Sequence, residues 1–180
     1  MKKILFIGMV LIGIIGLSSF IKSDDSRGTK PAKSIYDFKI ESIDGGKINF
    51  SDYKGKYILI VNTASKCGYT PQYKGLEQLY KDYGDKLVVI GFPSDNFADQ
   101  EFHDNVEIKS FCEKNYGVTF PLTKIIPVFY YLTHKSQNGV MDATISWNFN
   151  KFLISPEGKL LGHFDSKVVP GSDKITHYFK

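Results

Sequence analysis

The chain has 180 residues, of which 42% are hydrophobic and 14% aromatic, which is enough apolar material for one well-packed domain. Its formal net charge of +4 comes mostly from the first thirty residues, where five basic side chains outnumber two acidic ones. The rest of the chain carries eighteen basic and seventeen acidic side chains, and a domain this close to neutral argues against a nucleic-acid partner.

The first thirty residues differ in pattern from the rest of the chain. Two lysines precede an apolar run over residues 4–17, and a small-x-small pattern ends that run, which is the form of a secretory signal peptide. Apolar character resumes directly afterwards, so an uncleaved membrane anchor over residues 4–21 is the alternative. We therefore expect residues 1–30 to be a signal peptide or an N-terminal anchor with a polar linker, and the protein to be exported (periplasmic or extracytoplasmic). Residues 31–180 are expected to form one domain, with membrane contact only through an uncleaved N-terminal segment.

The domain is predicted to begin with a hairpin and a strand–helix unit. Residues 35–50 alternate between polar and apolar side chains around an Asp-Gly-Gly turn signal. The continuous, β-branched run Tyr57–Val61 predicts a strand that is buried on both faces. A helix is expected next, because tyrosine and leucine side chains recur at helical spacing over residues 73–83. Thr70, as a capping residue, followed by Pro71 is a helix-start signal.

Cys67 lies in the predicted loop between this strand and this helix. A thiol there is close to the unpaired N–H groups and the positive end of the helix dipole, which favour the thiolate, and Lys66 adds a neighbouring cation. A free cysteine is also a common small, buried hydrophobe. Position alone therefore leaves both catalysis and core packing open for Cys67.

The remaining chain predicts further strands and helices. Successive strand, helix and strand units imply a parallel, right-handed crossover. The only other cysteine, Cys112, falls in a predicted helix and, taken alone, fits a core position beside Phe111. The expected elements are a buried strand at Leu87–Phe92, a loop at 93–104, a helix at Val106–Tyr116, an amphipathic helix within Leu122–Ser136, a hairpin at Phe152–Phe164 and a closing helix at Ser172–Lys180.

No metal or cofactor site is expected from the sequence. The acidic and amide residues of the 93–104 loop lack the glycine and the terminal glutamate of an EF-hand. The four histidines are scattered along the chain without ligand spacing. We therefore predict chemistry that uses side chains alone.

The residues around Cys67 separate three classes of thiol enzyme. Thioredoxin-type exchange enzymes carry a second cysteine three residues on, where this chain has Thr70. A typical peroxiredoxin signature places threonine three residues and proline seven residues before the cysteine, where this chain has Ala64 and Ile60. The motif NTASKCGYT, residues 62–70, instead resembles the peroxidatic loop of the glutathione peroxidase family in its cysteine-containing form.

Two further blocks carry the same resemblance. The block GFPSDNFADQE, residues 91–101, resembles the second block of the family, and SWNFNKFLISPEGKLLGHF, residues 146–164, resembles its third. The three blocks occur in order, and the resemblance covers about residues 35–180. It implies an α/β, thioredoxin-like fold, with a central mixed sheet of four or five strands flanked by helices on both faces.

The resemblance also implies an active-site tetrad of cysteine, glutamine, tryptophan and asparagine. Cys67, Trp147 and Asn148 match three of its members, and the glutamine position falls on Asn96, which is one methylene shorter. A lone tryptophan is more often a core residue, so the role of Trp147 rests on the asparagine and phenylalanine beside it.

Cys112 has a second interpretation in this family. In members reduced by thioredoxin, a resolving cysteine lies some 45 residues after the attacking one, and Cys112 falls there. A disulfide needs the two Cα atoms within roughly 7 Å, so a remote, helical Cys112 requires local unwinding of its helix.

We therefore predict a thiol peroxidase, a glutathione peroxidase-like oxidoreductase that reduces hydrogen peroxide and organic hydroperoxides in antioxidant defence. Cys67 is expected to attack the peroxide, and Cys112 is expected to form a disulfide that a thioredoxin-like donor clears. The N–H donors of Asn148, Trp147 and Asn96 are expected to stabilise the sulfur anion and the developing charge on oxygen.

Two alternatives to this prediction remain open. One is a glutathione-dependent peroxidase in which Cys112 is structural; Arg27 is the only arginine, so within the domain the glutathione carboxylates would meet only lysines. The other is a non-catalytic redox sensor in which Cys67 oxidises once and signals to a partner. The join from Thr123 to Pro127 is shorter than the insertion through which animal members of the family form tetramers, so we expect a monomer or a weak dimer.

Overall fold

The computed structural model describes residues 34–124 and 129–180. The predicted signal peptide or anchor and its linker, residues 1–30, lie outside the described residues. Within the described ranges, none of the helices combines the length and the apolar character needed to cross a bilayer.

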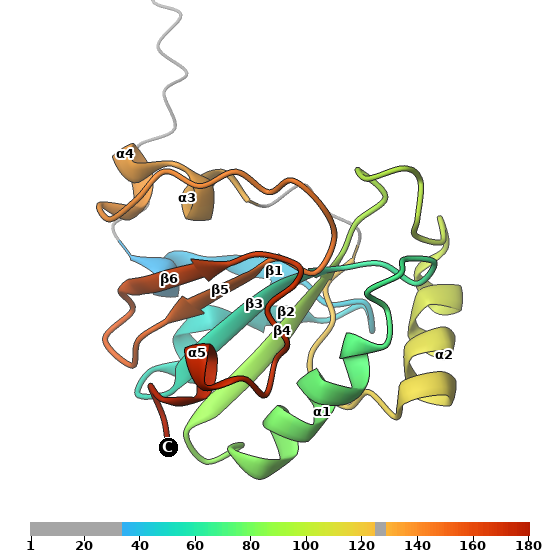
Figure 1. Cartoon of the computed structure of the whole chain (residues 1–180), viewed down its shortest axis with the longest axis horizontal. Helices are drawn as coiled ribbons and strands as arrows, with labels where there is room; N and C mark the ends of the chain where they lie inside the picture. The colour runs from blue at the N-terminus through green and yellow to red at the C-terminus, as the bar shows by residue number, and fades with distance from the viewer. Residues whose placement is uncertain (1–33, 125–128) are drawn as a thin grey trace, which may run out of the picture. The chain divides into compact units, whose positions relative to one another are not determined.

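Within the described residues, a mixed sheet of four strands forms the centre of the domain, in the order β4-β3-β5-β6 (Figure 1). Strand β3 runs parallel to β4 and antiparallel to β5, while β5 and β6 form an antiparallel hairpin. This arrangement confirms the predicted central mixed sheet, and a separate small hairpin, β1–β2, confirms the predicted N-terminal one. The strands are β1 Lys39–Glu41, β2 Lys47–Asn49, β3 Tyr57–Thr63, β4 Leu87–Pro93, β5 Lys151–Ile154 and β6 Leu160–Phe164.

Helices lie on both faces of this sheet. Side chains of α1, α2 and α5 pack in the core on one face, and α3 packs with the small hairpin on the other (Figure 1). Two 3-10 turns flank the small hairpin and contribute to the second core. The helices are α1 Gln72–Asp82, α2 Asn105–Tyr116, α3 Tyr130–Thr133, α4 Lys135–Asn138 and α5 Asp173–Thr176, and the 3-10 turns are η1 Ile35–Asp37 and η2 Phe50–Tyr53.

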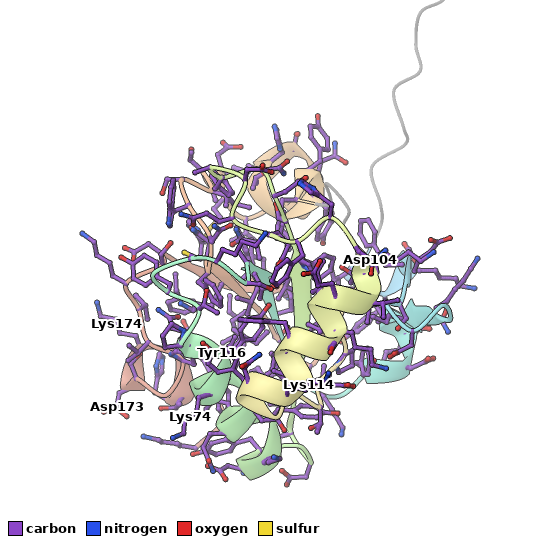
Figure 2. The ribbon with its side chains drawn as sticks, turned by 90° about the vertical axis from the view of Figure 1, so that its right-hand side faces the viewer. Lys74, Asp104, Lys114, Tyr116, Asp173 and Lys174 are labelled. Carbon is purple, nitrogen blue, oxygen red and sulfur yellow. The ribbon has the colours of Figure 1, made fainter. Side chains whose placement is uncertain are left out.

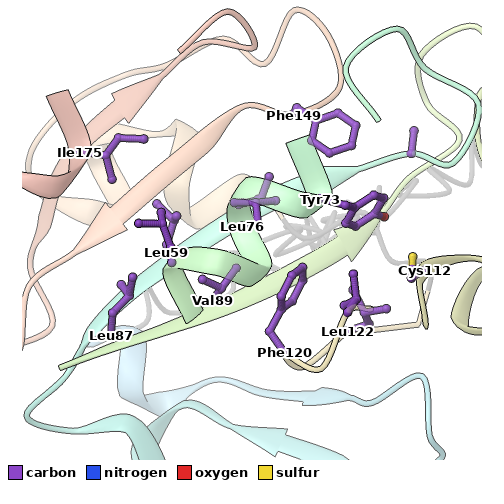
Figure 3. Close-up of a cluster of buried hydrophobic side chains, with 14 of the residues drawn as sticks. Leu59, Tyr73, Leu76, Leu87, Val89, Cys112, Phe120, Leu122, Phe149 and Ile175 are labelled. Atoms are coloured by element: carbon purple, nitrogen blue, oxygen red, sulfur yellow. The ribbon is translucent and has the colours of Figure 1, made fainter. Parts of the chain in front are cut away.

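Alternate residues of β3 point into two hydrophobic cores. Leu59 and Val61 belong to the first core together with Leu76 of α1, and Figure 3 shows Leu59 and Leu76 there. Ile58 and Ile60 pack in the second core, under the small hairpin. This burial on both faces confirms the interpretation of the continuous apolar run as a doubly covered strand.

The predicted amphipathic helix within residues 122–136 is wrong in its extent. Its first residues form isolated β-bridges, and residues 125–128 lie outside the described residues. Farther on, α3 and α4 are separate four-residue helices, because His134 between them has extended backbone angles. The side-chain amide of Asn138 donates to three main-chain carbonyls in this segment, which stabilises a compact turn instead of a continuous helix.

The closing helix predicted at 172–180 is also shorter in the structure. The helix α5 has four residues, and the chain then continues in turns. Main-chain hydrogen bonds there alternate between partners three and four residues apart, as from Tyr178 to Ile175 and from Lys180 to Thr176, and such a pattern does not extend a regular α-helix.

One charged side chain lies inside the domain and joins three elements. Lys151 of β5 is fully buried, and its Nζ donates to the Gln72 side chain at 2.5 Å and to the carbonyls of Val168 and Ser166 at 2.6 and 3.4 Å. Burial lowers the pKa of Lys151 to about 8, although the charge of Asp165 opposes this shift. The ammonium therefore holds the start of α1 and the segment after β6 against β5. Its burial removes the water that would otherwise hydrate the charge, which costs free energy.

The buried lysine predicts a pH dependence of stability. Its folded-state pKa of about 8 lies below its ordinary value of 10.5, so between these values the unfolded chain binds more protons and the free energy of unfolding rises with pH. We expect the wild type to gain stability relative to Lys151→Met between pH 7.5 and about pH 9.5, measured by urea denaturation. The exposed Lys159→Met controls for the loss of one positive charge, and parallel pH profiles of wild type and Lys151→Met would contradict the assignment.

Candidate active site

Cys67 lies on the loop between β3 and α1, at the carboxyl end of β3, where the sequence places it. Its side chain is 7% exposed, so the sulfur lies at the edge of the core. Its Sγ accepts the main-chain N–H of Tyr69 at 3.4 Å. The neighbouring Lys66 is exposed, with its ammonium over the ring of Phe102, 4.1 Å from the ring centre. An N–H donor on the sulfur stabilises negative charge there.

The predicted capping role of Thr70 is wrong, because its hydroxyl holds the Cys67 loop instead. Thr70 Oγ1 accepts the main-chain N–H of Cys67 at 2.9 Å and donates to the carbonyl of Ala64 at 2.8 Å. The helix α1 begins at Gln72, and its N-cap position, Pro71, has no side-chain hydrogen bond. The hydroxyl thus satisfies two buried main-chain groups of the reactive loop.

The loop after β4 supplies acceptors to the same segment. Glu101 Oε1 accepts the main-chain N–H of Ser65 at 3.0 Å and that of Phe102 at 2.9 Å. The carbonyl of Gln100 accepts the N–H of Lys66 at 2.8 Å. Glu101 is fully buried, and burial raises the pKa of its carboxyl above the ordinary value, although these N–H donors oppose the shift.

Asn62, near the end of β3, holds the segment that carries Trp147 and Asn148. Its Nδ2 donates to the carbonyl of Trp147 at 3.0 Å, and its Oδ1 accepts the N–H of Asn150 at 2.8 Å. Phe149 has a φ of 61°, in the left-handed region that bulky side chains rarely occupy, and its N–H donates to the carbonyl of Asn62 at 2.7 Å. These contacts fix the tryptophan and asparagine backbone to the strand that leads to Cys67.

Trp147 is half-buried, lines one surface hollow and lies near a second. The first, of about 410 Å³, is lined by Tyr69, Ser146, Trp147, Asp165, Ser166 and Lys167. The indole also contacts Phe97, with ring centres 6.0 Å apart, and Phe97 lines the second hollow, of about 420 Å³. A substrate therefore has room on the surface next to the tryptophan and the Cys67 loop.

The two amide members of the predicted tetrad lie in different environments. Asn148 is fully buried, and its Nδ2 donates to Gln100 Oε1 at 3.1 Å. Asn96 is exposed, lines the second hollow, and donates its main-chain N–H to Ser94 Oγ at 3.3 Å. Among the described residues, the Asn96 side chain forms no hydrogen bond with Cys67 or Asn148.

Cys112 lies on α2, between the Asp104 cap at the helix start and Tyr116 in its last turn (Figure 2). Its side chain is fully buried and the Tyr73 hydroxyl points toward it (Figure 3). Burial raises the pKa of the Cys112 thiol to about 12, and the charge of Glu101 acts in the same direction. Both cysteines are free thiols, so α2 keeps Cys112 in its protonated, unreactive form in this conformation.

Two aspartates and a histidine come together in the 93–104 loop. His103 lies 3.9 Å from an oxygen of Asp95 and 3.8 Å from one of Asp99, and the ligand atoms of all three lie within 4.8 Å of one another. The three residues stand four positions apart along the chain. The three side chains are largely exposed, and pairs of this kind on a surface contribute little to stability.

Comparisons with known proteins show relatives over most of the described domain. A family model for glutathione peroxidase matches residues 35–135. The chain belongs to the glutathione peroxidase family. It is 44% identical over 145 residues to a glutathione peroxidase of Lactococcus lactis, covering 76% of this chain and 92% of that protein. It is 45% identical over 146 residues to a glutathione peroxidase-like peroxiredoxin of Schizosaccharomyces pombe, covering 76% and 91%.

The solved structures give the same result for the fold. The crystal structure of Trgpx in apo form superposes with a TM-score of 0.60 at 36% identity, over 81% of this chain and 95% of that one. The fold is therefore the thioredoxin-like α/β fold expected of the glutathione peroxidase family, and the chain is a peroxidase of the oxidoreductase class.

The family motifs alone did not identify four residues that hold the site together: Asn62, Gln100, Glu101 and Ser166. The first three lie inside the recognised blocks, and their polar side chains next to buried strands were an available signal, because a buried polar group needs a partner. Ser166 Oγ donates to the carbonyl of Asn148 at 2.5 Å, and it lies outside the three blocks, so the sequence carried no signal for it.

The Thr70 hydroxyl gives a direct test of how the loop is held. Thr70→Val keeps the size of the side chain but leaves the N–H of Cys67 and the carbonyl of Ala64 without partners. We expect a loss of about 1–3 kcal/mol in the free energy of unfolding and a slower reaction of Cys67 with peroxide, measured by denaturation and by stopped-flow kinetics. Thr70→Ser keeps the hydroxyl and is the control; equal values for the two variants would show that the hydroxyl does not hold the loop.

Proposed function

We propose that this protein is a thiol peroxidase in which Cys67 reduces hydrogen peroxide and organic hydroperoxides, Cys112 forms a disulfide with it, and a thioredoxin-like donor reduces that disulfide. The observation that carries the proposal is the position of Cys67. Its sulfur accepts a main-chain N–H of its own loop. The N–H of Lys66 in this loop donates to the carbonyl of Gln100 in the loop after β4, and the Gln100 side chain contacts Asn148. The family motifs name the same cysteine as the attacking residue.

The first step moves one oxygen atom. The Cys67 thiolate attacks an oxygen of the hydroperoxide, a sulfur–oxygen bond forms as the oxygen–oxygen bond breaks, and the sulfur becomes a sulfenic acid. The leaving oxygen takes up a proton and departs as water or an alcohol. The sulfur is thereby oxidised by two electrons and the peroxide is reduced by two.

Neutral N–H donors near the sulfur support this step. Negative charge moves from sulfur to the leaving oxygen, and preorganised donors stabilise such charge without reorganisation. We assign this role to the Asn148 amide and the Trp147 indole, whose backbone is held by Asn62, and include Asn96 from the family motif. Among these, Asn148 is fully buried, where a hydrogen bond to an anion is strongest.

The second step closes the disulfide. The Cys112 thiol attacks the sulfenic sulfur of Cys67, a sulfur–sulfur bond forms, and the hydroxyl leaves with the thiol proton as water. The full burial of Cys112 on α2 means that part of this helix must unwind first. The C-terminal part of this helix, just after Cys112, carries the exposed polar residues Glu113 and Lys114, which lose little apolar burial on opening.

The donor is proposed from the charge of the site surface. The described residues contain no arginine, so a glutathione carboxylate there would meet only lysine side chains, which lack the bidentate guanidinium fork. A protein dithiol donor needs no such contact, because it reduces the disulfide by thiol exchange.

One observation favours a second candidate function, a glutathione-dependent peroxidase with a structural Cys112. The thiol is buried beside Tyr73 in the first core and has a pKa of about 12, which suits a packing residue. In that case one glutathione forms a mixed disulfide with the sulfenic sulfur of Cys67 and releases water, a second glutathione frees the Cys67 thiol as glutathione disulfide forms, and Cys112 takes no part.

Two cysteine variants distinguish these candidates. We expect Cys67→Ser to abolish peroxide reduction with every donor, because no other described thiol lies at the site. We expect Cys112→Ser to keep the first oxidation of Cys67 but to lose steady-state turnover with thioredoxin, measured by NADPH consumption in a coupled assay. Residual peroxidase activity of Cys67→Ser would refute the proposal, and full glutathione-supported turnover of Cys112→Ser would establish the second candidate.

A further inference from the structure

Gln100 contacts both parts of the proposed active site. It lies in the loop between β4 and α2, next to the buried Glu101. Its main-chain carbonyl accepts the N–H of Lys66, beside Cys67, at 2.8 Å. Its side-chain Oε1 accepts Nδ2 of Asn148 at 3.1 Å. One residue thus joins the reactive loop to the asparagine of the third block.

The hydrogen bond from Asn148 Nδ2 to Gln100 Oε1 determines which N–H of the Asn148 amide is left for another acceptor. The amide nitrogen has two N–H bonds, of which Gln100 accepts one, and the other remains for an anion at the reaction centre. With Gln100 presenting its oxygen, turning the Asn148 amide by half a turn would set two acceptors against each other, so the orientations of the two amides are coupled. The Asn148 main chain is held separately, because its carbonyl accepts Ser166 Oγ at 2.5 Å.

Asn96, the residue at the tetrad glutamine position, does not make this contact. Its side chain is exposed and lies beside the second hollow, and residues 97–99 separate it from Gln100 along the loop. Asparagine is one methylene shorter than glutamine, so its amide reaches less far into the site. Gln100 is half-buried, and its longer side chain reaches Asn148.

We propose that Gln100 is a positioning residue that orients the Asn148 amide toward the reaction at Cys67. Gln100 lies in the second block, four residues after Asn96 at the tetrad glutamine position. The inference rests on the proposed function. It assigns no contact between Gln100 and the substrate, and its whole effect on the rate passes through Asn148.

The test compares the first oxidation of Cys67 by hydrogen peroxide with alkylation of Cys67 by iodoacetamide, in the full chain with Cys112 replaced by serine. Alkylation consumes the thiolate without an oxygen leaving group. Gln100→Met keeps the length of the side chain without the amide. We expect this variant to slow the reaction of Cys67 with peroxide about tenfold, and to slow its alkylation by a smaller factor. Asn96→Ala should slow peroxide reduction less than Gln100→Met does.

A double variant separates positioning from a general effect on the loop. We expect Asn148→Ala to lose more peroxide reactivity than Gln100→Met, and Gln100→Met to cause no further loss in the Asn148→Ala background. Independent, multiplied losses would overturn the inference, as would wild-type peroxide reactivity of Gln100→Met. Melting temperatures are measured for every variant, and Gln100→Ala replaces Gln100→Met if the latter unfolds.

The outcome for this inference is distinct from that for the function. If the wild-type residue Cys67 does not react with peroxide, the proposed function fails. If it reacts and only the predicted effect of Gln100→Met is missing, the function stands and the positioning role of Gln100 is refuted.

Discussion

The position of the reactive sulfur depends on the hydrogen bonds of four main-chain N–H groups in the loop after β3. The N–H of Ser65 donates to the Glu101 carboxylate, and that of Lys66 donates to the carbonyl of Gln100. The N–H of Cys67 donates to the Thr70 hydroxyl, and that of Tyr69 donates to the Cys67 sulfur. A buried loop must satisfy such groups, since each one left unpaired costs about 1–3 kcal/mol. The acceptors come from both sides of the loop, so the geometry of Cys67 is set by β4 and its loop as much as by its own neighbours.

The second half of the site is attached to the same strand. Asn62 binds the main chain on either side of Asn148, and this contact accompanies a left-handed backbone at Phe149. Such a conformation persists only where the surroundings determine it, and the neighbouring Trp147 and Asn148 depend on it for their direction. Three blocks that are far apart in the sequence therefore meet at the carboxyl end of one buried strand.

The sequence predicted the parts of the fold that depend on local pattern. The doubly buried strand at Tyr57–Val61, the helix after it and the α2 helix follow from hydrophobic periodicity, and the structure confirms them. It failed where a tertiary contact decides: the Thr70 hydroxyl binds Cys67 instead of capping a helix, and the aromatic segment near His134 breaks into two short helices. In the site, motifs located the reactive residues, whereas the contact from Gln100 to Asn148 joins separate blocks and needed the structure.

The account requires that Cys67 be oxidised first and that Cys112 leave its buried place on α2 to reach it. The most direct measurement is peptide mass spectrometry of the reduced protein after one equivalent of hydrogen peroxide, with the remaining thiols alkylated under non-reducing conditions. We predict a disulfide-linked pair of peptides that contain Cys67 and Cys112, with a loss of two hydrogens from the intact mass. A Cys67 that is still fully alkylated after the peroxide has been consumed would contradict the account.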